Sequence, residues 1–509
     1  MHSLTSTGMV VCALLSAWPA SAWSQGHDSR PSDTPPTAAT VRVPADLASI
    51  RTALLDRVRK REVPSLSVGV IRDGVILWEE SIGWADRQAS QPATPFTRYP
   101  VASVSKSITA TGALALVAEG ALRLDQPVQQ ALKPFSLNRE GESVNAVLVS
   151  QLLSHTSGIP HLWRYEFPDR PNSIVRRERL IRDHAFVAVP PGERFVYSNL
   201  GFAVLAHVVE VAGGAPFQRV MERVLLKPLG MQRTTVGAWI GQRGTVRGYD
   251  GGGKRIPYRY RLAPDGGAGF FSNVHDLLQY AHFHLGAGEQ ATPSRSAAIA
   301  DAVRAAPVGG HYLRGWGVVR LRSATVLISD GESAGGTAVV VLVPEKQLGV
   351  VVLCNQTGGP ATESATAILA ALIPGFAEQF GAAASAVDAE MSTPGVQPSG
   401  QFEGFISGTT TRIAAGVDFS DPAAPLLRLG ATTYPLKVTG WDNGALKATV
   451  AGASPLGVGI GRTRRLLLTL WPRGGVSPGL RGVAQEDLFD DRPRSGTPYF
   501  VRLEAVQRP

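Results

Sequence analysis

Ser103 and Lys106 stand three residues apart in VASVSKSITATGAL, where the sequence predicts the start of a helix over 103–119. Residues three apart share one face of a helix, so the hydroxyl and the amine can meet. A serine hydroxyl is a weak nucleophile until a base takes its proton, and lysine can be that base when burial lowers its pKa. The helix N-terminus adds N–H donors that favour an oxyanion. The alternative is a surface lysine that follows a capping serine.

A second group of polar residues, Tyr197-Ser198-Asn199, lies in PPGERFVYSNLGF. The segment predicts a loop just before a helix that begins near Leu200. A tyrosine beside a lysine can exchange protons with it, and an asparagine amide can hold that lysine or a substrate carbonyl. By itself, Tyr197 would fit a half-buried core aromatic better than a catalytic residue.

Together these residues resemble the serine β-lactamase and penicillin-binding-protein (D-alanyl-D-alanine carboxypeptidase) superfamily, especially its class C and esterase-like branch. The resemblance covers about 45–375 and includes LLSHTSGIPHL, LLKPLGM, PDGGAGFFSNVHDLLQYAHF and LVPEKQLGVVVLCN. Several ordered matches are more specific than one motif. The resemblance implies an acyl-enzyme on Ser103, Lys106 as base, Tyr197 as proton shuttle and Asn199 as a positioning residue. We expect His155, in HTSG, to hold a loop by hydrogen bonding.

The third motif of this superfamily is altered. The superfamily places Lys-Thr-Gly or His-x-Gly on the strand beside the nucleophile, whereas alignment from Gly335 and Pro344 puts Ser329-Asp330-Gly331 there. The same alignment implies that the backbone N–H of Glu332 is the second oxyanion donor. Without the usual cationic or imidazole side chain, we expect a substrate carboxylate to bind poorly and an uncharged ester to lose nothing. Arg314 or Arg320 could supply the missing charge from another loop.

Three other interpretations compete with this one. Gly331-Glu332-Ser333-Ala334-Gly335 matches the G-x-S-x-G nucleophile elbow, but a strand is predicted after Ser333 where an elbow needs a helix. His282 and His284 are the closest histidine pair, yet no metal-binding motif accompanies them, and we expect no metal or other cofactor. The third alternative is a catalytically weak or inactive cell-wall binding or sensor protein of the same fold.

The pattern of elements predicts an α+β fold. Strands are expected in SLSVGVI and VILWEESIGW, joined by an Asp73-Gly74 turn, and again in WGVVRL, TVLISD, TAVVVLVP and LGVVVLC. Early and late strands should share one antiparallel sheet flanked by helices, with a mainly helical lobe inserted between them. The expected divisions are a signal peptide over 1–22, a linker over 23–43, a hydrolase domain over 44–375, a linker over 376–400 and an all-β domain over 401–509.

The beginning of the chain and its charge bear on location and partners. Met9–Trp18 is a short apolar run followed by Ala20-Ser21-Ala22, which is typical of a secretory signal, so we expect a periplasmic or secreted protein without an integral membrane segment after cleavage. The net charge of +9 is scattered and no nucleic-acid-binding motif accompanies it. The expected partners are a small-molecule or peptide substrate, with cell-wall peptidoglycan a candidate, and not nucleic acid.

Overall fold

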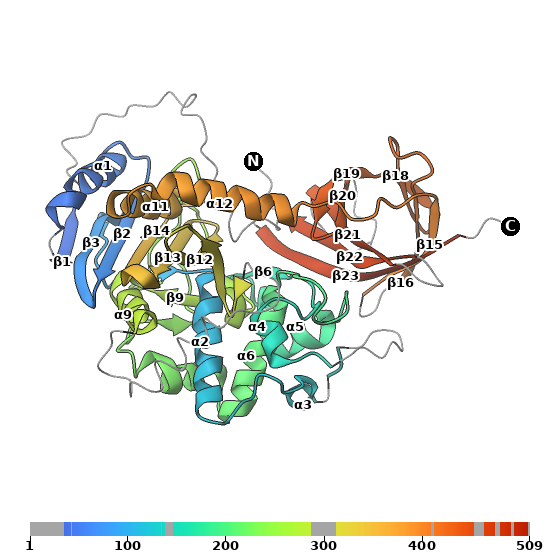
Figure 1. The fold of residues 1–509 in the computed structure, drawn as a ribbon, viewed down its shortest axis with the longest axis horizontal. Helices are drawn as coiled ribbons and strands as arrows, with labels where there is room; N and C mark the ends of the chain where they lie inside the picture. The colour runs from blue at the N-terminus through green and yellow to red at the C-terminus, as the bar shows by residue number, and fades with distance from the viewer. Residues whose placement is uncertain are drawn as a thin grey trace.

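A computed structural model describes residues 35–41, 43–133, 135–137, 146–286, 312–408, 412–451, 463–473, 479–489 and 493–506 (Figure 1). The expected signal peptide lies outside these residues, as does the expected linker up to residue 34. The rest of that linker includes a strand, β1, which pairs with β3 at the edge of a sheet.

The described part of the hydrolase domain contains a nine-stranded sheet in the order β1-β3-β2-β14-β13-β12-β11-β10, with β4 paired to β3. The expected sharing of early and late strands is confirmed, because β14 runs antiparallel to β2. Asp73 and Gly74 have φ angles of 50° and 77° and make the turn between β2 and β3. The β-branched runs of β13 and β14 are buried along their whole length, since helices cover both faces.

The strands of this sheet are β1 (Thr37–Val41), β2 (Ser65–Arg72), β3 (Val75–Asp86), β4 (Gln91–Pro92), β10 (Tyr312–Leu313), β11 (Trp316–Arg320), β12 (Thr325–Ser333), β13 (Gly336–Val343) and β14 (Leu348–Cys354). A three-stranded sheet joins β5 (Tyr99–Pro100), β9 (Phe270–Ser272) and β7 (Thr235–Val236). The helices are α1 (Ala48–Arg59), α2 (Val104–Ala118), α3 (Gln129–Leu132), α4 (Val149–Leu153), α5 (Arg177–His184), α6 (Asn199–Gly213), α7 (Phe217–Met221), α8 (Asp265–Ala268), α9 (Val274–Leu285), α11 (Pro360–Leu372) and α12 (Phe376–Met391).

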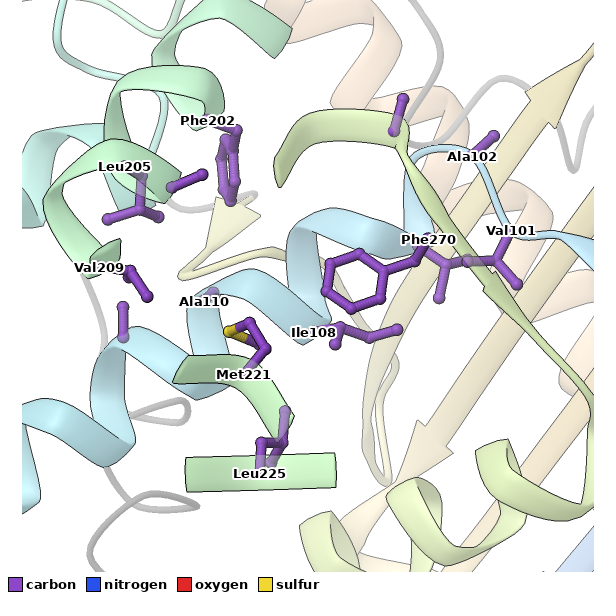
Figure 2. Packing of buried hydrophobic residues seen from close by; sticks show 14 of the residues in the cluster. Val101, Ala102, Ile108, Ala110, Phe202, Leu205, Val209, Met221, Leu225 and Phe270 are labelled. Carbon is purple, nitrogen blue, oxygen red and sulfur yellow. The ribbon is translucent and has the colours of Figure 1, made fainter. Parts of the chain in front are cut away.

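Helix α2 lies at the centre of the hydrolase domain, between the sheet and the helical lobe (Figure 1). Its residues from Val104 to Leu116 are buried, as expected for a helix that is apolar on all sides. Ile108 and Ala110 of α2 belong to the same core as Met221 and Leu225 (Figure 2). This core fixes the helix whose first turn carries Ser103.

The segment 376–400 differs from the linker that its Ala, Ser and Gly content indicates. Phe376–Met391 is the long helix α12, which runs from beside α11 toward the C-terminal domain (Figure 1). Its buried side chains belong to the core that α1 and α11 form with one face of the nine-stranded sheet. They are Phe376, Phe380, Ala384 and Val387. The apolar periodicity therefore outweighs the small-residue composition, and only the residues after Met391 connect the domains without regular structure.

The C-terminal domain is all-β, as expected. Its strands form one antiparallel sheet with its own apolar core. Two strands of the hydrolase domain extend that sheet, because β23 pairs with β6 and β6 pairs with β8. The two domains thus share a continuous hydrogen-bonded ladder. The strands are β6 (Trp163–Glu166), β8 (Arg261–Ala263), β15 (Gln401–Ser407), β16 (Arg412–Asp418), β17 (Leu426–Leu429), β18 (Thr432–Pro435), β19 (Lys437–Asp442), β20 (Ala445–Ala451), β21 (Thr463–Arg473), β22 (Gly479–Phe489) and β23 (Pro493–Ala505).

Among the described residues, no single helix has both the length and the apolar character needed to cross a membrane. One pair, Asn199–Gly213 with Phe217–Leu226, reaches that length and composition only when joined across a bend of 71°.

Candidate active site

The turn before α2 presents Ser103. Ala102 has a φ of +42°, a conformation that costs a non-glycine residue energy, and Ser103 follows as the N-cap of the helix. Gly331 of β12 packs against this turn so closely that an added Cβ would lie 2.5 Å from the Ser103 nitrogen. Only glycine fits at 331, which brings the β12 backbone next to the nucleophile.

Lys106 lies one helical turn further on and points back at Ser103. Its Nζ donates to the Ser103 Oγ at 2.9 Å and to the carbonyl oxygen of Gly267 at 2.8 Å. The side chain is 1% exposed, and this burial lowers the pKa of Lys106 well below its ordinary value, while the charge of Asp330 opposes the shift. A buried amine with a depressed pKa is suited to accept the Ser103 proton.

Tyr197 completes the arrangement from the other side of Ser103. Its hydroxyl donates to the Ser103 Oγ at 2.8 Å, and the Lys106 Nζ lies 4.6 Å from the centre of its ring. Burial raises the pKa of the phenol, so Tyr197 stays protonated at neutral pH. The three groups that the sequence singled out for nucleophile, base and proton shuttle are therefore in mutual contact.

His155 holds the loop that carries Tyr197. Its Nδ1 accepts the backbone N–H of Ser198 at 3.1 Å, and its ring packs 4.6 Å from the Tyr197 ring. Burial lowers the pKa of His155 well below its ordinary value, so the ring is neutral and Nδ1 is free to accept. The Ser198 Oγ accepts the backbone N–H of Gly201 and thereby caps α6. The loop hydrogen bonding expected for His155 is what the structure contains.

The altered third motif, Ser329-Asp330-Gly331, lies on β12 beside the turn that carries Ser103. Ser329 is buried and donates from Oγ to the Ser107 Oγ at 3.0 Å. Asp330 is half-buried, and burial raises its pKa to about 7. The carboxylate of Glu332 accepts the backbone N–H of Gly358 at 3.0 Å. The motif thus supplies a close-packed backbone at Gly331 and an acid, Asp330, where the superfamily has a cation or imidazole nearby.

A pocket of about 350 Å³, including its open mouth, lies in front of the nucleophile. Tyr312 and Gly315 form part of its wall and were not among the residues indicated by sequence. Tyr312 follows a stretch without a recognisable motif, so no sequence signal pointed to it. Arg314 and Arg320, which could have replaced the missing cation, are not in the wall. The lining consists of Ser103, Tyr197, Tyr312, Gly315, Ile328, Ser329, Asp330, Gly331 and Glu332.

Asn199 occupies a different position from its expected partners. Its Oδ1 is buried, and within the described ranges it has no hydrogen-bond partner. Asn199 is not among the residues of the pocket wall. Its backbone instead packs against Gly267, where an added Cβ would lie 3.0 Å from the Asn199 carbonyl oxygen. Asn199 therefore borders the helix α8, whose Gly267 carbonyl oxygen accepts a hydrogen bond from Lys106.

The rival nucleophile and the histidine pair lie away from the Ser103 pocket. Ser333 ends β12 and is followed by a turn into the strand β13, which is not the strand–turn–helix of a nucleophile elbow. Its Oγ is buried and bonded to the Tyr260 hydroxyl at 3.0 Å. The Nε2 of His284 lies 3.1 Å from the Thr111 Oγ1. In the described chain, the one group with metal-ligand spacing is Glu178, His207 and Glu210, and it does not include His282 or His284.

The family follows from comparison with known proteins. The Beta-lactamase family model matches residues 50–373, which is more than half of the chain and contains Ser103, Lys106 and Tyr197. The chain belongs to the β-lactamase family. This β-lactamase-family chain is 25% identical to a "Beta-lactamase" of Pseudomonas fluorescens over 350 residues, covering 62% of this chain and 95% of that one. It is 31% identical to "Esterase EstB" of Burkholderia gladioli over 334 residues, covering 58% and 83%.

The β-lactamase-family fold with a second domain also occurs among solved structures. The octameric penicillin-binding protein homologue from Pyrococcus abyssi aligns with a TM-score of 0.54 and 23% identity, over 90% of this chain and all of that one. The structure titled "Crystal structure of SurE" aligns with a TM-score of 0.59 and 20% identity over 91% of this chain and 99% of that one. At these identities the likeness establishes the fold, including the C-terminal all-β domain, and not the substrate.

Proposed function

We propose that this β-lactamase-family chain is a serine hydrolase that forms an acyl-enzyme on Ser103 and acts on an uncharged ester or amide in preference to a carboxylate-bearing β-lactam. The observation that carries the proposal is the contact of three groups: the Lys106 amine and the Tyr197 hydroxyl both hydrogen-bond the Ser103 Oγ, at 2.9 and 2.8 Å. A weak nucleophile held between an amine of depressed pKa and a protonated phenol is arranged for acyl transfer.

The reaction follows from these contacts. Neutral Lys106 takes the Ser103 proton as Oγ attacks the substrate carbonyl carbon. The oxyanion is held by the backbone N–H groups of Ser103 and Glu332, which line the same pocket. Tyr197 then passes a proton from Lys106 to the leaving group, and the carbon–leaving-group bond breaks. Water attacks the acyl-enzyme, the same groups move its proton to the Ser103 Oγ, and the acid is released.

The preference for uncharged substrates rests on the charge of the pocket wall. Asp330 adds a carboxyl group to the pocket wall, and Ser329, at the position of the superfamily's cation or imidazole, has an uncharged hydroxyl that bonds Ser107. A charge-assisted hydrogen bond is worth about 1.5–3 kcal/mol, and its loss costs carboxylate substrates roughly 10- to 100-fold. Penicillins and D-alanyl-D-alanine peptides carry that carboxylate, whereas simple esters do not.

Export belongs to the same proposal. The apolar run Met9–Trp18 and the small residues at 20–22 support secretion followed by action outside the cytoplasm. Fractionation of cells that express the full chain, with sequencing of the N-terminus of the exported form, tests this part. Retention of an uncleaved chain in the cytoplasm would contradict it.

The activity is tested by turnover of p-nitrophenyl butyrate beside a chromogenic cephalosporin, with intact-mass measurement of the trapped acyl-enzyme. We expect clear ester turnover, weak cephalosporin turnover and an adduct on Ser103. Equal rates on both substrates would refute the preference. Absence of turnover and of any adduct would favour the alternative of an inactive binding or sensor protein.

A further inference from the structure

A second pocket lies at the boundary of the two domains and shares a wall with the first. The hydrolase domain contributes His161 and Tyr197 to it, and the C-terminal domain contributes Lys447, Trp471 and Gln485. We call it the boundary pocket. It contains about 570 Å³ of space, including its open mouth. Its complete lining is Pro160, His161, Phe195, Val196, Tyr197, Asp442, Asn443, Lys447, Thr469, Trp471, Val483 and Gln485.

The boundary pocket is a built part of the fold. Arg194 Nη1 donates to the Asn443 carbonyl oxygen at 2.8 Å, and the Asn443 Nδ2 donates to the Phe195 carbonyl oxygen at 3.3 Å. A separate apolar cluster, which includes Phe186, Trp471 and Phe500, packs the domains together beside it. These contacts hold C-terminal side chains in fixed positions next to the loop of Tyr197.

Two hydrogen-bond donors in the wall have no partner within the described parts of the chain. They are the Nε1–H of Trp471 and the Nε2 amide of Gln485, on side chains that are 6% and 8% exposed. A buried donor without an acceptor costs about 1–3 kcal/mol, which an arriving acceptor recovers. His161 adds a third donor: its Nδ1 accepts the Asn199 N–H at 3.3 Å, so the proton of the neutral ring lies on Nε2.

The charges of the boundary pocket balance one another. The Lys447 Nζ lies 3.3 Å from the Asp442 carboxylate and donates to the Thr469 Oγ1 at 3.0 Å. Burial lowers the pKa of His161 to about 3, so its ring carries no charge at neutral pH. A carboxylate ligand would meet Asp442, and an ammonium ligand would meet Lys447 and the N–H donors. The wall therefore suits an uncharged group rich in acceptors, and Phe195 and Val483 add apolar surface for its neighbours.

The position of Tyr197 between the two pockets indicates which part of a substrate the boundary pocket would bind. Tyr197 hydrogen-bonds the Ser103 Oγ and lines both pockets. In the proposed reaction it delivers the proton to the leaving group, so the leaving group must lie on the Tyr197 side of the scissile bond. The boundary pocket is on that side.

We propose that the boundary pocket is the leaving-group subsite, and that it takes an uncharged segment bearing an amide or ester carbonyl, bound by Trp471, Gln485 and His161. This inference rests on the proposed function and gives the C-terminal domain a direct part in substrate recognition.

The test compares two butyrate esters in the full-length protein. One has N-acetylethanolamine as its alcohol and the other has 1-pentanol, which has the same chain length without the amide. Both give the same acyl-enzyme, so the ratio of their kcat/KM values reports on the leaving group alone. We expect the wild type to prefer the amide-bearing ester, and Trp471→Phe and Gln485→Leu each to lower that ratio about 10-fold. Trp441→Phe, in the same domain but outside the pocket, should leave the ratio unchanged.

A structural role would produce another pattern. Equal losses on both esters, or an unchanged ratio in both variants, would overturn the proposal. Calorimetric binding of the two esters to Ser103→Ala separates this inference from the proposed function, because binding needs no acyl transfer. Tighter binding of the amide-bearing ester, weakened by Trp471→Phe, would support the subsite even if the wild type turned over neither ester. Equal binding of the two esters would refute it.

Discussion

The Tyr197 hydroxyl lies 2.8 Å from the Ser103 Oγ across 94 residues of sequence. The two residues come from the start of α6 and the start of α2, and these helices pack against each other in the core that Figure 2 shows. The packing of two apolar helices therefore sets a distance on which the chemistry depends.

Ser103→Ala should abolish both ester turnover and covalent labelling, because no other hydroxyl contacts Lys106 and Tyr197 together among the described residues. Intact-mass measurement after incubation with a p-nitrophenyl ester checks this. Ser333→Ala is the matched control and should keep its activity, since the Ser333 Oγ bonds Tyr260 away from the nucleophile. An adduct that maps to Ser105 or Ser333 would contradict the assignment.

Lys106→Arg should lower kcat/KM by about 10²–10⁴-fold, because a guanidinium cannot deprotonate near neutral pH. In the wild type, kcat/KM should rise with pH through the depressed pKa of Lys106. Asp330→Asn should move this rise to lower pH, since the carboxylate of Asp330 raises the pKa of the amine. A pH profile of ester hydrolysis measures both effects. Near-normal rates in Lys106→Arg would rule out its role as base.

His155→Ala should lower kcat about 10-fold and leave KM nearly unchanged, because it frees the Ser198 amide and loosens the Tyr197 loop without touching the pocket. His155→Asn offers a carbonyl oxygen as a replacement acceptor and should recover part of the loss. A fall in thermal stability with unchanged kcat would mean that the histidine serves the fold alone.

Asp330→Asn should raise kcat/KM for a cephalosporin about 10-fold relative to p-nitrophenyl butyrate, since it removes a negative charge from the pocket that must take the carboxylate. Ser329→Lys, which restores a cation near the family position, should move the balance the same way if the lysine reaches past Ser107. If the ratio of kcat/KM for the cephalosporin to kcat/KM for the ester is unchanged in both variants, another group determines how the substrate carboxylate binds.

Asp330→Asn should also change how stability depends on pH. Burial raises the folded-state pKa of Asp330 from 3.8 to about 7, so between these values the folded protein binds more protons than the unfolded chain. Stability conferred by this group therefore falls as pH rises from about 4 to about 7. The variant cannot ionise there, and it should gain at most about 4 kcal/mol over the wild type at pH 8, from a pKa difference worth about 1.4 kcal/mol per unit, and almost nothing near pH 4. Thermal unfolding at the two pH values measures the difference.

Local pattern was enough to predict that the Ser103 hydroxyl and the Lys106 amine meet. Ser103 and Lys106 share a helix, and the Asp73–Gly74 turn lies within one hairpin, so short-range rules fix both. The all-β character of the C-terminal domain followed from its alternation. The family resemblance supplied the remote partner, Tyr197, which no local rule could place beside Ser103.

The parts that sequence reasoning missed depend on long-range packing. The segment 376–391 looked like a linker because Ala, Ser and Gly dominate it, although Phe376, Phe380, Ala384 and Val387 repeat at helical spacing. This spacing can be found in the sequence alone and would have predicted the helix α12. The boundary pocket was not accessible in this way, because it needs the register that places Trp471 and Gln485 beside Tyr197.

The ladder from β23 through β6 to β8 has a mechanical consequence. A free tether after α12 would let the C-terminal domain swing, but the shared ladder must rupture before the domain can turn away from the hydrolase domain. A pull on the C-terminal end loads that ladder and, through it, the segments that flank the Tyr197 loop. We therefore expect the two domains to yield together under force, with catalysis lost at the moment of first rupture.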